Sequence, residues 1–311
     1  MRPLPDSPDK RVASPYHGLT SVFHLIELAD EVSWEPAATF GLSCVGQGLE
    51  QLPLEENLAW KAAQAFAAAT RSELPALRIH IEKHIPSGAG LGGGSADAAA
   101  VLALFWNVTK GTVPFAVLQQ LASSLGADVA FFLAESAACL MGGIGDKLLA
   151  TLRPAAGVPV VIVWDQAALV STPQVYAAFD RSPLPLDLVG EAALVAALSE
   201  CNSTPGPLPS SQGVADIELV APHLYNNLSA AAFAVSPAAQ RVHTFVHDAP
   251  QAQAAALSGS GGASFALCAS ADDAQVLAQR ARAEGFAAQA TKLAGQTLGT
   301  QLASEQEVGK R

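Results

Sequence analysis

The sequence lacks any long hydrophobic run, and this absence excludes an integral membrane protein built on apolar helices. Its longest apolar stretches, such as residues 158–164, are too short to cross a bilayer. The N-terminal residues are polar and rich in proline, so they do not resemble a signal peptide. We therefore expect a cytoplasmic protein.

Cysteine is scarce and positive charge is in deficit. The four cysteines have neither disulfide-framework nor metal-ligand spacing, so we expect free thiols and no metal bound by the protein's own cysteines: Cys44, Cys139, Cys201 and Cys268. The 17 Lys and Arg residues against 28 Asp and Glu give a net charge of −11. This balance argues against a broad nucleic-acid-binding or membrane-binding surface. We expect a small-molecule substrate instead.

What the sequence does contain is a glycine-rich segment at residues 86–96, in which five of the eleven residues are glycine. It lies between a predicted strand and a predicted helix. Glycine adopts positive φ angles without a Cβ penalty, so such a loop can turn its backbone N–H groups toward an anion. The first amides of the following helix and the positive end of its dipole add to this preference. The segment predicts a site for the phosphates of a nucleotide.

The two common phosphate-binding fingerprints do not fit this segment. Residues 88–93 match GxGxxG, but a dinucleotide site needs an acidic residue about 20 positions further on. After Asp97 the next acidic residue is Asp128. A Walker A loop needs a lysine before its Ser or Thr, whereas Gly94 is followed directly by Ser95. A phosphate loop of a third kind is favoured over a purely structural turn.

The hydrophobic pattern of the 311-residue chain predicts a mixed α and β protein in two parts, residues 1–152 and 153–311. In the first part we expect strands at 20–35, 39–45 and 77–82, a strand pair at 137–152, and helices beginning near Asn57 and covering 95–107 and 114–124. In the second part we expect strands at 158–164 and 264–268, and helices near 172–179, 190–199, 225–247 and 271–284.

Four separated motifs together resemble the GHMP small-molecule kinases. They are the loop at 86–96, residues 126–129 (Gly-Ala-Asp-Val), residues 258–262 (Ser-Gly-Ser-Gly-Gly), and residues 15–23 (Pro-Tyr-His-Gly-Leu-Thr-Ser-Val-Phe). The last of these resembles a segment of the family members that phosphorylate a cytidine-diphosphate sugar alcohol in the non-mevalonate route to isoprenoids. The likeness covers roughly residues 14–290. It implies an α+β fold of two lobes, the first like domain 2 of ribosomal protein S5 and the second ferredoxin-like.

The resemblance also implies a site and a reaction. It implies ATP and Mg²⁺ as cofactors and transfer of the γ-phosphoryl group to a hydroxyl of the cytidine compound. Asp128 would take the hydroxyl proton, and burial in an apolar stretch would raise its pKa. Tyr16, His17 and Tyr176 would hold the cytosine, and Ser258, Gly259, Ser260 and Gly261 would approach the phosphates. The residues that would cradle ATP are Pro86, Ser87, Gly88, Ala89, Gly90, Leu91, Gly92, Gly93, Gly94, Ser95 and Ala96.

One family feature has no counterpart here. The family begins with a strand whose lysine lies near the catalytic aspartate, but residues 1–11 are rich in proline and Lys10 is too near Tyr16 to take that role. Two explanations stay open: a start at an internal methionine, or a diverged and catalytically impaired member. We predict that the printed chain binds ATP better than it turns it over.

Alternative functions also stay open at this point. Another GHMP kinase, of the homoserine or mevalonate type, would share the loop and Asp128. A catalytically silent nucleotide-binding protein would fit the missing lysine. A dinucleotide-dependent oxidoreductase is disfavoured by the missing acidic residue.

Overall fold

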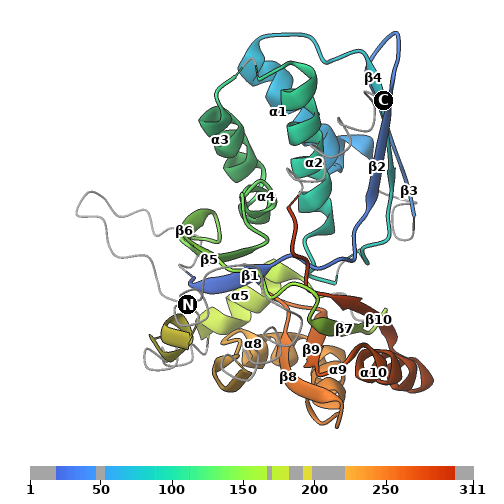
Figure 1. The fold of residues 1–311 in the computed structure, drawn as a ribbon, viewed down its shortest axis with the longest axis vertical. Helices are drawn as coiled ribbons and strands as arrows, with labels where there is room; N and C mark the ends of the chain where they lie inside the picture. The colour runs from blue at the N-terminus through green and yellow to red at the C-terminus, as the bar shows by residue number, and fades with distance from the viewer. Residues whose placement is uncertain are drawn as a thin grey trace.

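The computed structural model describes residues 19–46, 53–87, 89–111, 113–166, 170–181, 192–197 and 221–297. Tyr16, His17 and Gly88 of the predicted site lie outside the described residues. Figure 1 shows the N-terminal and C-terminal parts of the chain as two lobes stacked along the longest axis of the molecule.

The N-terminal lobe contains two small sheets. The first has the antiparallel order β1-β5-β6, formed by β1 (Ser21–His24), β5 (Ala138–Gly142) and β6 (Lys147–Leu152). The second has the order β2-β4-β3, with β4 (Leu77–Glu82) antiparallel to β2 (Glu31–Pro36) and parallel to β3 (Gly41–Val45). The helices of this lobe are η1 (Leu54–Glu56), α1 (Leu58–Thr70), α2 (Gly93–Val108), α3 (Phe115–Leu125) and α4 (Ala127–Phe132).

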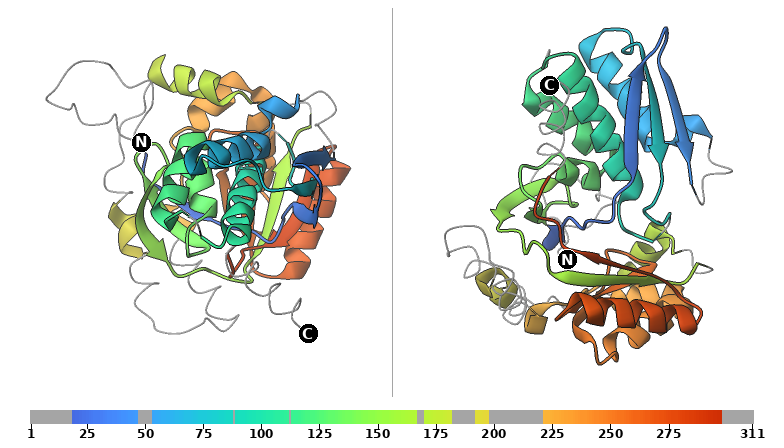
Figure 2. Two further views of the ribbon diagram at one scale, coloured as in Figure 1. Left: turned by 90° about the horizontal axis from the view of Figure 1, so that it is seen from above. Right: turned by 45° about the vertical axis from the view of Figure 1, so that its right-hand side comes forward.

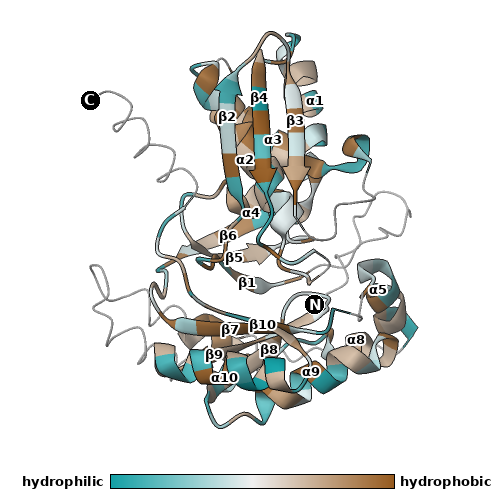
Figure 3. Cartoon of the chain, turned by 90° about the vertical axis from the view of Figure 1, so that its right-hand side faces the viewer, coloured by the Kyte–Doolittle hydropathy of each residue, from teal (hydrophilic) through white to brown (hydrophobic). Residues whose placement is uncertain are grey.

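The core of this lobe lies between the second sheet and the helices, which cover one face of it (Figures 2 and 3). Leu77, Ile79 and Ile81 alternate along β4 with more exposed residues and are all buried, as the sequence pattern predicts. From the helix side, the rings of Phe66 and Phe105 meet edge-on with 5.6 Å between their centroids. This packing holds α1 against α2, the helix that follows the glycine-rich segment.

The C-terminal lobe is a four-stranded antiparallel sheet of order β10-β7-β9-β8, covered on one face by two helices. Its strands are β7 (Pro159–Trp164), β8 (Ala252–Leu257), β9 (Ala263–Cys268) and β10 (Ala287–Lys292), and the covering helices are α9 (Pro237–His247) and α10 (Ala271–Ala283). The shorter helices α5 (Thr172–Arg181) and α8 (Ser229–Val235) pack together beside β8, and η2 spans Ala221–His223. Among the described residues no helix has both the length and the apolar character to span a membrane.

The α+β architecture in two lobes agrees with the prediction, but several elements differ. The strand predicted at 20–35 is two strands in different sheets, because residues 25–30 leave the first sheet to bond elsewhere. The helix predicted at 225–247 is broken at Ser236, whose extended backbone precedes Pro237 and whose hydroxyl accepts from the amide of Ala239. Strands β8 and β10 and helix α4 were not predicted from the sequence.

Backbone hydrogen bonds join the two lobes along one edge. Ile26 of the N-terminal lobe forms an antiparallel bridge with Leu293, just after β10. The amide of Glu27 donates to the carbonyl of Lys292 (2.9 Å), and the amide of Ala294 donates to the carbonyl of Leu25 (2.8 Å). The segment that follows β1 is therefore tied to the end of the C-terminal sheet.

Candidate active site

The glycine-rich segment forms the loop between β4 and α2. Gly90 and Gly92 both have positive φ angles, 74° and 71°, which L side chains rarely adopt. Gly92 is the residue before α2, and the helix begins at Gly93, two residues earlier than predicted. In the described part of the chain, the amides of Gly93, Gly94 and Ser95 have no backbone hydrogen-bond partner. They are donors for an anion at the positive end of the helix dipole.

A second loop, residues 258–262 between β8 and β9, lies directly on the first. The Ser258 hydroxyl donates to the carbonyl of Gly90 (3.3 Å). A Cβ atom on Gly90 would lie only 3.3 Å from the backbone oxygen of Ser258. Residues 168 positions apart in the sequence thus meet so closely that a side chain at Gly90 would crowd the second loop.

Two polar side chains hold the second loop in place. The Asn226 side-chain amide donates to the carbonyls of Leu257 (3.0 Å) and Gly259 (2.7 Å). The hydroxyls of Ser260 and Thr172 lie 2.7 Å apart, and Thr172 is the first residue of α5. The loop therefore also fixes the start of α5.

Asp128 lies beside the glycine-rich loop. It is the second residue of α4, and its Oδ2 atom is 3.8 Å from the point that a Cβ on Gly92 would occupy. The side chain is exposed, yet protein atoms crowd it, and this partial desolvation raises the pKa of its carboxyl group. Solvent contact limits the size of that shift. The direction agrees with the expectation from the sequence.

Tyr176, one helical turn into α5, is the described member of the predicted cytosine-binding set. Its pKa is raised mainly by burial and further by the negative charge of Asp128. The second cause places the phenol within electrostatic reach of the carboxylate. The structure thus brings Tyr176, Asp128 and both loops to one region between the lobes.

A buried cluster of three charges lies on the other flank of the loop. The Lys83 ammonium, just after β4, forms ion pairs with Asp30 and with Asp97, the latter at 2.5 Å. All three side chains are at most 6% exposed. Asp30 also accepts hydrogen bonds from the amides of His84 (2.6 Å) and Ile85 (2.8 Å). Asp97 is the fifth residue of α2, and its carboxylate points at Lys83.

Lys83 and Asp30 were not among the site residues predicted from the sequence. The two side chains are 53 positions apart, and neither stands in a recognisable motif. The available signal was weak: Lys83 follows directly after an alternating strand and shortly before the glycine-rich loop.

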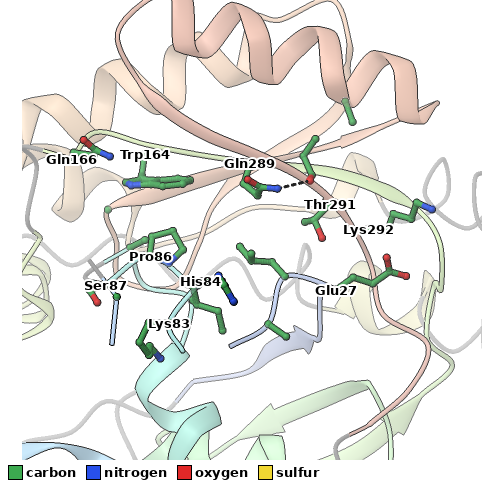
Figure 4. A pocket seen from close by; sticks show the side chains of 18 of the residues that line it. Glu27, Lys83, His84, Pro86, Ser87, Trp164, Gln166, Gln289, Thr291 and Lys292 are labelled. Atoms are coloured by element: carbon green, nitrogen blue, oxygen red, sulfur yellow. Dashed lines mark hydrogen bonds between the residues drawn. The ribbon is translucent and has the colours of Figure 1, made fainter. Parts of the chain in front are cut away.

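A cavity of about 1200 Å³ separates the lobes next to this cluster. Figure 4 shows Lys83, His84, Pro86 and Ser87 on one side of it, facing Trp164, Gln289 and Thr291 of the C-terminal sheet. The loop residues 86, 87 and 89 contribute to its wall, whereas Asp128 and Tyr176 do not. The glycine-rich loop therefore has the cavity on one flank and the Asp128 region on the other.

Comparison with known proteins gives consistent results. Residues 57–143 match the family model described as GHMP kinases N terminal domain. The chain is 37% identical, over 260 residues, to the 4-diphosphocytidyl-2-C-methyl-D-erythritol kinase of Mycobacterium tuberculosis (strain H37Rv), covering 83% of this chain and 77% of that protein.

Solved structures agree. A crystal structure of 4-(cytidine 5'-diphospho)-2C-methyl-D-erythritol kinase superposes with a TM-score of 0.67 at 33% identity, covering 90% of this chain and 91% of that one. The homoserine kinase of Cytophaga hutchinsonii superposes with a TM-score of 0.63, covering 93% and 98% of the two chains. At 18% identity, this second likeness shows the fold alone.

Proposed function

Because this chain belongs to the 4-diphosphocytidyl-2-C-methyl-D-erythritol kinase family of the GHMP kinases, we propose that it transfers the γ-phosphoryl group of ATP to a hydroxyl of 4-diphosphocytidyl-2-C-methyl-D-erythritol. The observation that carries the proposal is the position of Asp128 beside Gly92, where a carboxylate adjoins a loop with free amides.

The proposed chemistry assigns one task to each feature. The amides of Gly93, Gly94 and Ser95 bind the phosphates, and the loop at 258–262 covers them. The oxygen of the acceptor hydroxyl attacks the γ-phosphorus, and Asp128 accepts the proton that this oxygen loses. The bond between the γ-phosphorus and the leaving ADP oxygen breaks in the same step. A general base of raised pKa is suited to this step because it is a stronger proton acceptor.

The same region of the molecule supports an assignment of the substrate-binding residues. We assign the cytosine ring to Tyr176, together with Tyr16 and His17, which lie outside the described residues. Position supports Tyr176, because its phenol lies within electrostatic reach of Asp128. ATP enters as its Mg²⁺ complex, so the ion belongs to the substrate. We further assign the lobe boundary to residues 152 and 153 and the site of action to the cytoplasm.

The lack of a counterpart for the family's lysine stays a prediction from the sequence, because residues 1–18 lie outside the described part of the chain. Lys83 does not fill that role, since two buried carboxylates already bind its ammonium. The weak turnover predicted for the printed chain therefore also stays a prediction.

The acceptor can be tested with γ-labelled ATP and three candidates: 4-diphosphocytidyl-2-C-methyl-D-erythritol, homoserine and mevalonate. We expect label in the first alone. Asp128→Asn should lower that rate by about 10²–10⁴, the usual contribution of a general base. Asp272→Asn, which makes the same change at an exposed position in α10, serves as the control. Labelling of homoserine or mevalonate in preference to the cytidine compound would contradict the proposal.

A further inference from the structure

The ion cluster of Asp30, Lys83 and Asp97 is connected to both ends of the glycine-rich loop. Lys83 stands three residues before the loop, and Asp97 stands in α2 after it. Asp30 fixes the intervening backbone by accepting from the amides of His84 and Ile85. A single ammonium group therefore joins the strand that enters the loop to the helix that leaves it.

The packing around this ammonium is tight. A Cβ atom on Gly93 would lie 3.3 Å from the Lys83 Nζ atom and 2.9 Å from Cγ2 of Ile85. The first residue of α2 thus rests directly on the Lys83 and Ile85 side chains. The Lys83 ammonium therefore lies next to the residue whose amide begins the helix.

The cluster has a surplus of negative charge. One ammonium faces two carboxylates, so the fully ionised cluster carries −1 in a buried position. Burial and the Asp30 carboxylate raise the pKa of Asp97, against the opposing effect of Lys83, to about 6. Among the described residues, Cys44 of β3 is a further titratable neighbour; its pKa is raised by burial and by Asp97, so it stays a neutral thiol. The exposed His84 is turned toward Glu82.

We propose that Asp30, Lys83 and Asp97 are a positioning unit for the phosphate loop, in which Lys83 holds both loop ends and the surplus carboxylate charge opposes a bound triphosphate. The inference rests on the proposed function in one respect, namely that the loop binds ATP. Since a polyanion at the start of α2 favours the neutral form of the Asp97 carboxyl group, MgATP binding takes up a proton at Asp97.

Calorimetry of MgATP binding, in two buffers of different ionisation enthalpy at pH 6.5, measures this proton uptake. Asp97→Asn keeps the shape of the side chain and leaves a neutral Lys83–Asp30 pair. We expect it to take up fewer protons than the unaltered chain and to bind MgATP about three- to tenfold more tightly at pH 8, as expected from removing one charge at an effective dielectric constant of about 20. ATP's own ionisation cancels in the comparison. The control, Asp272→Asn, should match the unaltered chain.

Lys83→Met tests the positioning role. We expect it to weaken MgATP binding at least about tenfold, with partial recovery in Lys83→Met/Asp97→Asn, where only the Asp30 carboxylate remains. If Lys83→Met does not fold, the comparison of Asp97→Asn with the unaltered chain decides alone. Equal proton uptake in those two proteins would overturn the inference. Absence of phosphoryl transfer would instead contradict the proposed function, because calorimetry needs no turnover.

Discussion

Two glycines of the phosphate loop, two positions apart, should respond in opposite directions to the same substitution. Gly92 has a φ of 71°, and a Cβ there would lie 3.1 Å from Cε2 of Phe132. Gly94 lies inside α2, where an added Cβ would meet only Cδ1 of Leu58, at an ordinary 3.7 Å. The two sites differ in backbone conformation and in free space, whereas the chemical change is identical.

The magnitudes follow from these geometries. An alanine in the left-handed region costs roughly 1–2 kcal/mol, and the contact with Phe132 adds to that cost for Gly92→Ala. In a regular helix, alanine is favoured over glycine by roughly 0.5–1 kcal/mol, which applies to Gly94→Ala. The free energies of unfolding should therefore differ by at least about 1.5 kcal/mol, or about 3 °C in Tm at roughly 2–4 °C per kcal/mol for a chain of this size class.

Thermal unfolding without ligand, followed by circular dichroism, measures the difference directly. We expect Gly92→Ala to melt below the unaltered chain and Gly94→Ala to melt at or above it. A Gly92→Ala protein that melts together with Gly94→Ala would refute the reasoning, since it would mean that the turn at Gly92 relaxes without cost. In Gly92→Ala the KM for MgATP should also rise, because the Asp128 carboxylate adjoins the added methyl group.

Three further outcomes are expected. Partial burial raises the pKa of Asp128, and the base acts when it is deprotonated, so kcat/KM should rise with pH through a value above the ordinary 3.8. A rate profile from pH 4.5 to 8 measures this rise, which should be absent from the residual activity of Asp128→Asn. The same rise in Asp128→Asn would exclude Asp128 as the base. Asn226→Ala removes the hydrogen bonds to the carbonyls of Leu257 and Gly259 and should lower the free energy of unfolding by about 1–3 kcal/mol, measured with denaturant. Asn227→Ala is the neighbouring control. Equal stability of the two variants would speak against this contact. Tyr176→Leu should raise the KM for the cytidine substrate about tenfold, because the aromatic contact is lost, and should leave the KM for MgATP unchanged. In Tyr176→Phe the KM for the cytidine substrate should stay close to that of the unaltered chain. An equal rise of this KM in Tyr176→Phe would mean that the hydroxyl, and not the ring, makes the contact.

The parts of the site that the sequence predicted are those carried by local motifs. A run of glycines between a strand and a helix predicts a loop with free amides, and the structure has that loop at the start of α2. The proximity of Asp128 and residues 258–262 followed from the family pattern, since nothing local relates segments so far apart in the chain.

The parts that were missed depend on contacts between distant segments. Asp30 and Lys83 are separated by 53 positions, and a buried ion pair leaves no periodic trace in either neighbourhood. The strands β8 and β10 are rich in alanine, which has little intrinsic preference for a strand. They are strands because β9 and β7 offer them hydrogen-bonding edges. Ser236 and Pro237 did carry a local signal for the break between α8 and α9, and it was overlooked.

Backbone hydrogen bonds connect residues 25–27 to residues 292–294, and this connection affects how the two lobes can move. Main-chain bonds fasten the two lobes together at that margin, and the glycine-rich loop is held from the other lobe as well, by the Ser258 hydroxyl and by the packing of Ala89 and Leu91 against the C-terminal sheet. A rotation of one lobe against the other would therefore have to break main-chain bonds at that margin or pull Ala89 out of an apolar cluster. The phosphate loop thus belongs by sequence to the first lobe and by packing to both lobes.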